Sequence, residues 1–440
     1  MYAQYVTLSP ISTFSKIIEK HVSNHLTSYL DNNSLISDNQ YGFRQQRSTT
    51  AAVLKITDHI LHNFDKGNYT IGVFLDLKKA FETVNCSNLL QKLKYLGIKD
   101  NALNWFESYL TERQQYVHYQ NTSSPKKYLS YSIPQGSTLG PLFFNIYIND
   151  ITSSTLHLNS ILFADDSCFY FSGNDINSVI DTVNSDLLFI DNWLKSNKLS
   201  LNLEKSHYII FNRNKNLPHD LDPLIIDNKI INRINITNFL GIHLNYDLKW
   251  HNHINIITNK LHKIKGIMYL TRDLLTRNSL TTIYYSLVYS HLIYGNIIWG
   301  RSSKTSLKCL EVAQKSIIRT IMFRGRYEHT NDDFISLGIL KLKDINRFSV
   351  CQFVFKSLNN LIVPTNYYQL AGNHHAYILR NVTNLELSIP FMGSLQSQSS
   401  PSFYGCHEWN NLPLEIRGRA SLASFKYNLK KSYIDSYRNS

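Results

Sequence analysis

The chain has 440 residues, 43% of them hydrophobic, which is too long for one ordinary core, so we expect two or three lobes. Lys and Arg number 45 against 32 Asp and Glu, and the net charge of +13 favours a polyanionic partner. The five cysteines are scattered without a Cys-x-x-Cys pair, which argues against a disulfide framework and a zinc knuckle. The N-terminus lacks the basic and apolar stretches of a secretory signal.

Two amphipathic helices are predicted near the N-terminus, because apolar residues recur there at helical spacing. Ser12 or Thr13 can cap the first helix and Ser48 can cap the second. We expect residues 38–47 to form the loop between them.

The apolar run Ile71–Asp76 has the length of a strand and ends abruptly on an acid. Ser87 can cap the helix that follows, and Asp100 is expected to open another. After it, Gln114–Tyr119 and Tyr128–Ser132 are predicted to pair as a hairpin about a Ser-Pro turn.

The tetrapeptide Phe163–Asp166 places two adjacent acids between two short apolar runs, which predicts a β-hairpin with the acids at its turn. Such turns prefer Asn-Gly or Asp-Gly, so an Asp-Asp pair after Ala is better explained by chemistry than by folding. A turn with both acids in water is the alternative for an isolated Asp-Asp pair.

If the strand that ends at Asp76 pairs beside this hairpin, its carboxylate meets those of Asp165 and Asp166 at one edge of a sheet. Carboxylates with little His or Cys nearby suit Mg²⁺. Two such ions would activate a hydroxyl and stabilise a leaving pyrophosphate.

Beyond the hairpin, Asp175 starts the clearest helix, which we expect to back the sheet, and helical spacing dominates from about residue 254. Residues 260–330 contain twelve Lys or Arg and three Asp or Glu. Such a lobe could bind a phosphate backbone, and a solvated basic surface is the alternative.

Residues 278–300 carry no formal charge but are too polar for a good membrane span, so we expect them to form a buried helix. Residues 396–402 are expected to form a flexible linker.

Several short motifs follow one another in order along most of the chain. They are Tyr41–Arg44 with Arg47–Thr50, Phe74–Phe81, Ile133–Ser137 with Leu139–Leu142 and Tyr147–Asp150, Phe163–Asp166, Leu201–Lys205, Phe239–Ile242 and Trp409–Pro413. The ordered set resembles the reverse transcriptase of a non-LTR retrotransposon of the LINE type, similar to the jockey elements. One such motif alone would be weak evidence, whereas the ordered set is specific.

The resemblance implies an α+β right-hand polymerase fold with helical fingers, an antiparallel palm sheet backed by helices, and a helical thumb and C-terminal region. Fingers and palm would occupy residues 8–243, the basic thumb 254–330 and the C-terminal region of the retroelement 331–440. The implied activity is that of an RNA-directed DNA polymerase, which adds deoxynucleotides to a primer 3′-hydroxyl with two Mg²⁺ ions, for which Mn²⁺ can substitute. The implied partners are an RNA template, a DNA primer and deoxynucleoside triphosphates, in the nucleus or cytoplasm and away from a membrane.

The same resemblance implies roles for residues at the motif positions. Asp76 and Asp165 would be metal ligands supported by Asp166, and the carbonyl of Leu77 could add a ligand. Phe81 resembles the steric gate that rejects a 2′-hydroxyl, with an ordinary core aromatic as the alternative.

Other roles concern the nucleotide and its phosphates. Gln135 and Gly136 would let the backbone approach the nucleotide and template. Lys205 could donate a proton to the leaving pyrophosphate or bind its phosphates, with a solvated lysine as the alternative. Arg44 and Arg47 are placed for phosphate contacts.

Three positions depart from the family pattern. Val6–Ser9 stands where Arg-Pro-Ile-Ser is usual, Glu82 replaces an Asp, and Ser132 replaces a Gly and is more restricted in φ. None of these removes a proposed metal ligand. Because the chain begins near the first polymerase motif, we expect a truncated copy without the upstream endonuclease domain. An inactive remnant that only binds nucleic acid, and a host-adopted or intron-type polymerase, are the alternatives.

Overall fold

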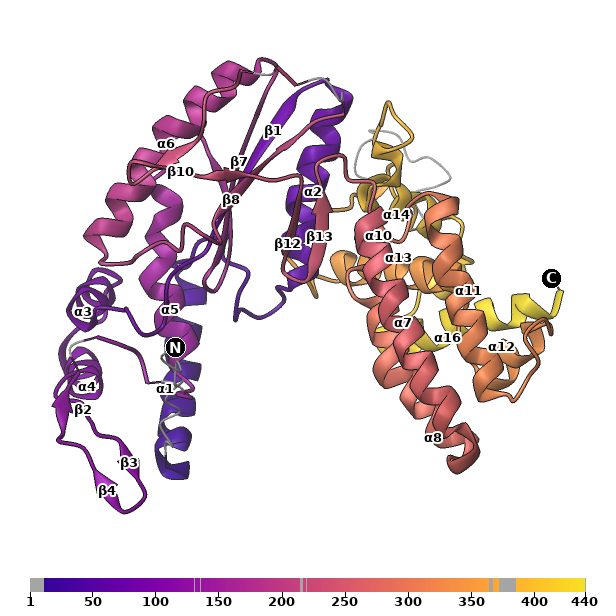
Figure 1. Cartoon of the computed structure of the whole chain (residues 1–440), viewed down its shortest axis with the longest axis horizontal. Coiled ribbons are helices and arrows are strands. Elements are labelled where there is room, and N and C mark those ends of the chain that lie inside the picture. The colour runs from indigo at the N-terminus through magenta and orange to yellow at the C-terminus, as the bar shows by residue number, and fades with distance from the viewer. Residues whose placement is uncertain are drawn as a thin grey trace. The chain divides into compact units, whose positions relative to one another are not determined.

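The computed structural model describes residues 12–129, 131–134, 136–213, 217–218, 220–363, 367–371 and 385–439. These residues form two compact units, each of which is described by itself (Figure 1). The first contains the described residues of 1–48, 69–210 and 214–234, and the second those of 49–68, 211–213 and 235–440. The three predicted segments, 8–243, 254–330 and 331–440, stay a prediction.

The first unit is built on a five-stranded sheet in the order β11-β8-β1-β7-β6. Its strands are β1 (Tyr69–Leu75), β6 (Asn159–Phe163), β7 (Asp166–Gly173), β8 (His207–Phe211) and β11 (Asn232–Arg233). β1 and β6 each pair antiparallel with β7, and only the short edge strand β11 pairs parallel to its neighbour β8. The predicted α+β class with an antiparallel sheet is therefore confirmed.

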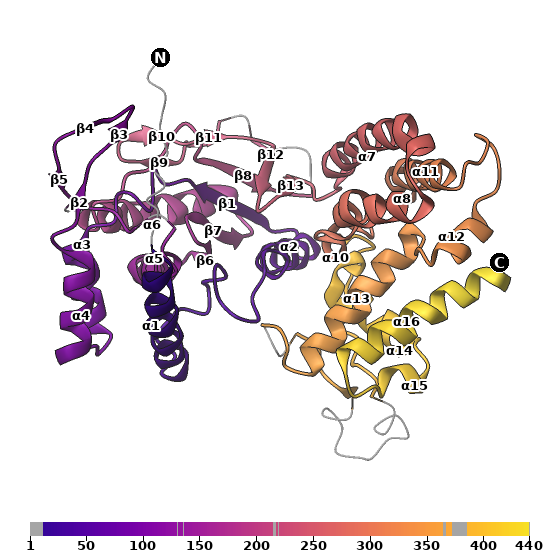
Figure 2. The same cartoon turned by 90° about the horizontal axis from the view of Figure 1, so that it is seen from below.

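Helices pack on this sheet and beside it (Figures 1 and 2). They are α1 (Thr13–Asn32), α3 (Cys86–Tyr95), α4 (Asp100–Leu110), α5 (Gly140–Ile148), the 3₁₀ turn η1 (Asn149–Ser153) and α6 (Ile176–Ser196). As predicted, Asp175 caps α6, its carboxylate accepting from the Ser178 amide, and α6 contacts β1 and β7. The predicted cap of α3 is wrong, because the cap is Asn85 and not Ser87, and the Asn85 side chain accepts from the Asn88 amide.

The hairpin that follows α4 differs from the predicted one. β2 (Gln114–Gln115) pairs with β5 (Lys127–Tyr128), and β3 (His118–Tyr119) pairs with β4 (Thr122–Ser123), so the tight turn falls at residues 120–121 and not at Ser-Pro. Both turn residues have positive φ, as a type I′ turn requires to match the twist of its strands. A further two-stranded pair, β9 (Ile225–Ile226) and β10 (Lys229–Ile230), completes the unit.

The second unit is mostly helical. Its elements are α2 (Thr49–Asp65), the hairpin β12 (Ile236–Phe239) and β13 (Ile242–Asn245), α7 (His251–Thr271), η2 (Arg272–Leu274), α8 (Arg277–Ile283), the π-helical turn η3 (Tyr284–Tyr289), α9 (Ser290–Ile293), α10 (Asn296–Trp299), α11 (Lys304–Ile321), α12 (Asn331–Leu337), α13 (Leu342–Leu358), η6 (Ser397–Ser399), α14 (Pro401–Asn410), α15 (Leu414–Arg417), α16 (Leu422–Ser436) and η7 (Tyr437–Asn439). The C-terminal motif contributes to its core, where buried Trp409 stacks on Phe425 at a centroid distance of 5.7 Å.

Helix α2 belongs to this second unit, although its residues lie within the segment 8–243 that we expected to form the fingers and palm. The reason lies in residues 394–400, which are packed against α2 and are not the predicted flexible linker. The Ser397 hydroxyl donates to the Leu61 carbonyl at 3.0 Å, and the Ser400 hydroxyl donates to the Asp58 carboxylate at 2.6 Å. Polar side chains that find partners in this way can be buried.

The uncharged stretch 278–300 is buried in part, but it is not the single helix that we expected. Leu280, Tyr284, Val288 and Leu292 recur every four residues and are buried. The helix passes through the π-helical turn η3 and breaks at Gly295, whose φ of +59° suits glycine. Among the described residues, no helix is long and apolar enough to cross a membrane.

Candidate active site

Three carboxylates lie at the ends of β1 and β7 because of the register of these strands. Leu75 pairs with Ser167, so the next residue of each strand brings Asp76 beside Asp166. Asp165 comes from the turn between β6 and β7, where Phe163 pairs with Asp166. The structure thus brings together the three acids that the sequence predicted as one cluster.

The charges of these acids act on one another. Packing around the Asp166 carboxyl raises its pKa, and the negative charges of Asp165 and Asp76 raise it further. A cation placed among the three would remove this repulsion. The cluster therefore has the electrostatics of a cation site.

The backbone of Asp76 is held on both sides by the 200–206 segment. Its amide donates to the Ser206 hydroxyl at 3.1 Å, and its carbonyl accepts from the Asn202 amide at 2.8 Å. Leu77 forms an antiparallel bridge with Leu201. The hydrogen bonds of this bridge are made by the flanking residues, from the Lys78 amide to the Ser200 carbonyl and from the Asn202 amide to the Asp76 carbonyl. In this geometry the carbonyl of Leu77 is not used in the bridge, and its predicted role as a ligand stays a prediction.

The turn that carries Asp165 is strained and closely packed. Ala164 has a φ of +55°, a region that costs a residue with a Cβ about 1–3 kcal/mol. Gly42 lies against it, since a Cβ on Gly42 would be 2.4 Å from the Ala164 nitrogen. No L side chain fits at this position without a shift of the hairpin backbone.

The chain around Gly42 is fixed by hydrogen bonds to the same hairpin. The Tyr41 amide donates to the Leu162 carbonyl at 2.7 Å, and the Leu162 amide donates to the Asn39 carbonyl at 2.9 Å, so residues 39–41 extend the sheet beside β6. Asn145 of α5 donates to the Gly42 carbonyl at 2.8 Å. The motif that contains Gly42 thus holds in place the hairpin that carries Asp165 and Asp166.

Carboxylate oxygens are of the donor type that Mg²⁺ prefers. Within the described residues, no three His, Cys, Asp or Glu side chains converge closely enough to enclose a metal ion. Mg²⁺ is commonly held by one or two carboxylates together with waters and substrate phosphates, so an open group of carboxylates suits it better than a closed cage. Asp76 and Asp165 would hold such an ion, with Asp166 in support.

Lys205 lies at the edge of the cluster. Its Nζ is 4.0 Å from the Asp76 carboxylate, and its side chain is 72% exposed. A pair this exposed contributes little to stability, so the ammonium can turn to a substrate phosphate at little cost. Its predicted role stays a prediction.

Phe81 is half-buried, and its ring packs on that of Phe144 at a centroid distance of 4.7 Å. One side of the residue thus belongs to the core while another reaches the surface. The structure is compatible with both the predicted gate and the core role.

Gly136 lies in a turn closed by a 3.1 Å bond from the Ser137 amide to the Pro134 carbonyl. Its φ of +85° explains why this position needs glycine. Gln135 lies outside the described residues. Ser132, just before this turn, has a φ of +88°, so the restriction expected for a residue that replaces glycine applies to it.

Glu19 is a positioning residue that the sequence analysis missed. It is buried on α1, and its carboxylate accepts from the Ser137 hydroxyl at 3.1 Å, the Thr138 amide at 2.7 Å and the Tyr109 hydroxyl at 2.8 Å. It therefore fixes the residues that follow Gly136. An acid on the apolar stripe of an amphipathic helix was the signal that could have found it.

Arg44 and Arg47 are engaged within the loop that precedes α2. Arg44 donates to the Ser37 carbonyl at 2.8 Å and to Asp31 at 3.2 Å, and burial lowers its pKa. Arg47, whose side chain is 4% exposed, donates to Asp38 at 2.7 Å. Their predicted phosphate contacts stay a prediction, and for Arg47 they would require these bonds to open.

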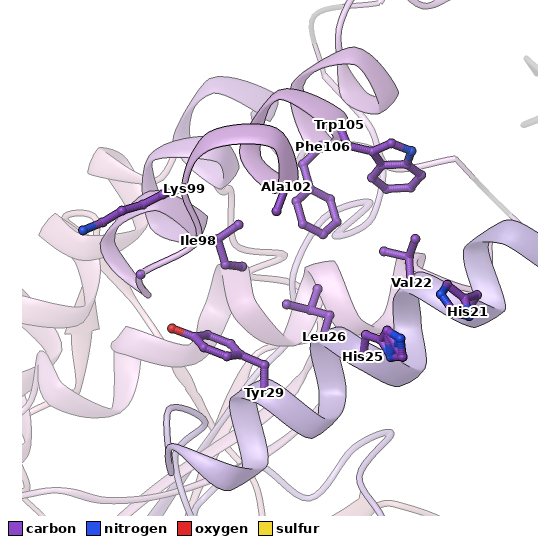
Figure 3. Close-up of a pocket in the computed structure, with 11 residues that line it drawn as sticks. His21, Val22, His25, Leu26, Tyr29, Ile98, Lys99, Ala102, Trp105 and Phe106 are labelled. Carbon is purple, nitrogen blue, oxygen red and sulfur yellow. The ribbon is translucent and has the colours of Figure 1, made fainter.

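A separate cavity of about 380 Å³ lies between α1 and α4 (Figure 3). His21, His25 and Leu26 face Trp105 and Phe106 across it. None of the predicted site residues that the structure describes lines this cavity, so it is not part of the carboxylate site.

The residues of this site lie within a segment that matches a known protein family. The model of the family described as reverse transcriptase (RNA-dependent DNA polymerase) matches residues 5–244, which include all three acids. The chain belongs to the reverse transcriptase family. Two residues that depart from the family pattern, Glu82 and Ser132, thus lie within a reverse transcriptase domain.

Relatives of this reverse transcriptase come from transposons. The probable RNA-directed DNA polymerase from transposon BS of Drosophila melanogaster is 28% identical over 59% of this chain and 29% of its own length. The RNA-directed DNA polymerase from mobile element jockey of the same fly is 26% identical over 77% of this chain and 38% of its own. The predicted resemblance to the jockey-like elements is confirmed, and the chain spans about a third of the length of these relatives.

Among solved structures, apo telomerase from Candida tropicalis aligns with 78% of this chain and 59% of its own. The alignment has a TM-score of 0.41 and 11% identity.

We predict that Gly42→Ala displaces the hairpin that carries Asp165. Its Cβ meets backbone atoms of the hairpin, so we expect a loss of about 1–3 kcal/mol in the free energy of unfolding and a drop of about 100-fold in primer extension on an RNA template. Gly393→Ala is the control, because its nearest contacts would be at 3.9 Å. Full extension and unchanged melting by Gly42→Ala would contradict this packing.

Phe81→Val distinguishes the gate from the core role. A gate predicts more ribonucleotide incorporation relative to deoxyribonucleotide, because steric overlap with the 2′-hydroxyl is relieved. A core role predicts a cavity that costs up to about 3–5 kcal/mol and lowers activity toward both nucleotides alike. The ratio of the two incorporation efficiencies, measured beside the melting temperature, decides, and an unchanged ratio rules the gate out.

Proposed function

We propose that the chain is the RNA-directed DNA polymerase part of a non-LTR retrotransposon, which adds deoxynucleotides to a primer 3′-hydroxyl on an RNA template. The observation that carries the proposal is the register that gathers Asp76, Asp165 and Asp166 at one edge of the sheet, inside the residues that match the reverse transcriptase family. The names of the transposon relatives support the choice of template and product.

Each residue of the site has a role in this chemistry. Divalent metal ions, when bound, would lower the pKa of the primer hydroxyl and offset the charge that develops on the leaving pyrophosphate. Asp76 and Asp165 would supply the negative charge that holds these ions, and the hydrogen bonds from Asn202 and to Ser206 keep the Asp76 backbone in place. Lys205, whose exposed ammonium lies 4.0 Å from the Asp76 carboxylate, would bind or protonate the departing phosphates.

The second unit supplies a basic surface on its own helices. Lys260 and Lys263 of α7 are exposed, as are Lys304, Lys308 and Lys315 of α11, which packs on α7. We propose that this surface holds the phosphates of the template and primer duplex.

A catalytically inactive remnant is the second candidate. The positive φ of Ser132 beside the Gly136 turn does not by itself favour this candidate, because the Ser132 and Ile133 amides hold the segment with hydrogen bonds to the carbonyls of Val84 and Phe81. The complete set of carboxylates favours the active enzyme.

Replacing one acid tests the proposal. Asp165→Asn removes a negative charge that no neighbour replaces, so we expect primer extension with Mg²⁺ on an RNA template to fall by at least about 100-fold while folding and template binding persist. Asp175→Asn is the control, because Asn caps a helix as well as Asp does. Equal extension by Asp165→Asn would reject the assignment, and a wild-type chain that binds template without extending it would favour the remnant.

Charge removal on α7 tests the basic surface. Lys260→Gln, Lys263→Gln and Lys265→Gln together should weaken duplex binding for all sequences alike and reduce the slope of log affinity against log salt by about one for each phosphate that the variant no longer binds. Lys343→Gln, Lys426→Gln and Lys431→Gln make the same charge change elsewhere in the same unit. If both triple variants share the wild-type slope, the α7 lysines are a solvated surface.

A further inference from the structure

The hairpin between α4 and the Gly136 turn projects as an arm from the body of its unit (Figures 1 and 2). We call residues 113–129 the hairpin arm. Its ladder runs from the 2.8 Å bond between the Leu129 amide and the Arg113 carbonyl to the pair Tyr119–Thr122 at its tip. An additional 2.9 Å bond joins the Ser124 amide to the Val117 carbonyl, so the arm is paired along most of its length.

The arm exposes three large aromatic side chains. Tyr116, Tyr119 and Tyr128 are 53%, 70% and 72% exposed, and Val117 beside them is 57% exposed. A two-stranded hairpin has no core of its own to bury them in. Exposed aromatic groups of this kind are typical of a segment that binds a partner.

The charge of the arm indicates the partner. Arg113, Lys126 and Lys127 lie on it together with His118, and the sequence from 113 to 131 contains no Asp or Glu. Tyrosine rings offer planar faces on which unpaired bases of any sequence can stack, and neighbouring cations bind the phosphates between those bases. Aromatic and basic residues combined in this way fit an unpaired nucleic-acid strand.

The base of the arm is tied to the segment that leads into the Gly136 turn. The Arg113 guanidinium donates to the Ser132 carbonyl at 2.7 Å, and the Ser132 amide donates to the Val84 carbonyl at 2.9 Å. The next amide, that of Ile133, donates to the Phe81 carbonyl at 3.1 Å. The arm is thus anchored beside two of the predicted nucleotide-binding positions, Phe81 and Gly136.

We propose that the hairpin arm is a binding platform for an unpaired nucleic-acid strand, with stacking on Tyr119 and Tyr128 and phosphate contacts from Lys126 and Lys127. The identity of that strand as the RNA template outside the duplex rests on the proposed function. The platform itself requires no catalysis.

Binding to labelled oligonucleotides, measured by fluorescence anisotropy with the full chain and a metal chelator, tests the platform. The probes are an oligouridine RNA of about 20 nucleotides and an RNA–DNA duplex of equal length. Tyr119→Ala with Tyr128→Ala should weaken single-strand binding by about tenfold or more and change duplex binding by less than about twofold. Tyr119→Phe with Tyr128→Phe keeps both ring faces and should bind as the wild type does.

Two further comparisons complete the test. Tyr95→Ala, which removes a tyrosine that is 92% exposed on α3, should leave both affinities unchanged. Lys126→Gln with Lys127→Gln should lower the salt slope of single-strand binding by about 1.4 if each lysine contacts one phosphate.

Several results would overturn the proposal. In the first, the variant with Tyr119→Ala and Tyr128→Ala binds the single strand as tightly as the wild type does. In the second, this variant loses affinity for the single strand and the duplex equally. In the third, the variant with Tyr119→Phe and Tyr128→Phe loses single-strand affinity as well. The first would leave a protein partner as the occupant of the arm. The chelator prevents nucleotide incorporation, so the assay measures binding alone. A chain that cannot extend a primer can therefore still support the proposed platform, and a chain that extends a primer can still refute it.

Discussion

Mutual repulsion among three carboxylates is the constraint on which the site depends. The antiparallel pairing of β1 with β7 brings Asp76 and Asp166 to the same end of the sheet, and the turn of β6 and β7 adds Asp165. Burial of the Asp166 carboxyl raises its pKa, and the negative charges of Asp165 and Asp76 raise it further. A sheet that holds like charges together without a cation loses stability, and binding of a divalent ion regains it.

The surrounding structure keeps these charges in place. Gly42 allows the backbone of one segment to lie against the strained turn at Ala164, and the 200–206 segment holds both sides of the Asp76 peptide. Glu19 does the same for the residues after Gly136. Strain at Ala164 and Ser132 persists because neighbouring hydrogen bonds over-determine both segments.

Local patterns predicted the strands, the long helices and the acid cluster, since these depend on periodicity and on residues close in sequence. Contacts between distant segments could not be predicted in the same way. The buried role of Glu19, the pairing of α2 with residues 394–400 and the loop contacts of Arg44 and Arg47 all depend on tertiary packing. The turn of the hairpin arm was misplaced because Gln120 and Asn121 adopt positive φ without a glycine.

The central claim is that two segments, one ending in Asp76 and the other turning at Asp165, hold one divalent-ion site. Fe²⁺ bound in place of Mg²⁺, with ascorbate and peroxide, produces hydroxyl radicals that cut the nearest backbone. Mapping of the cut sites on the intact chain should show cleavage near residue 76 and near residues 164–166, and excess Mg²⁺ should suppress both. Cleavage at only one of these segments, or cleavage that Mg²⁺ does not suppress, would contradict the account.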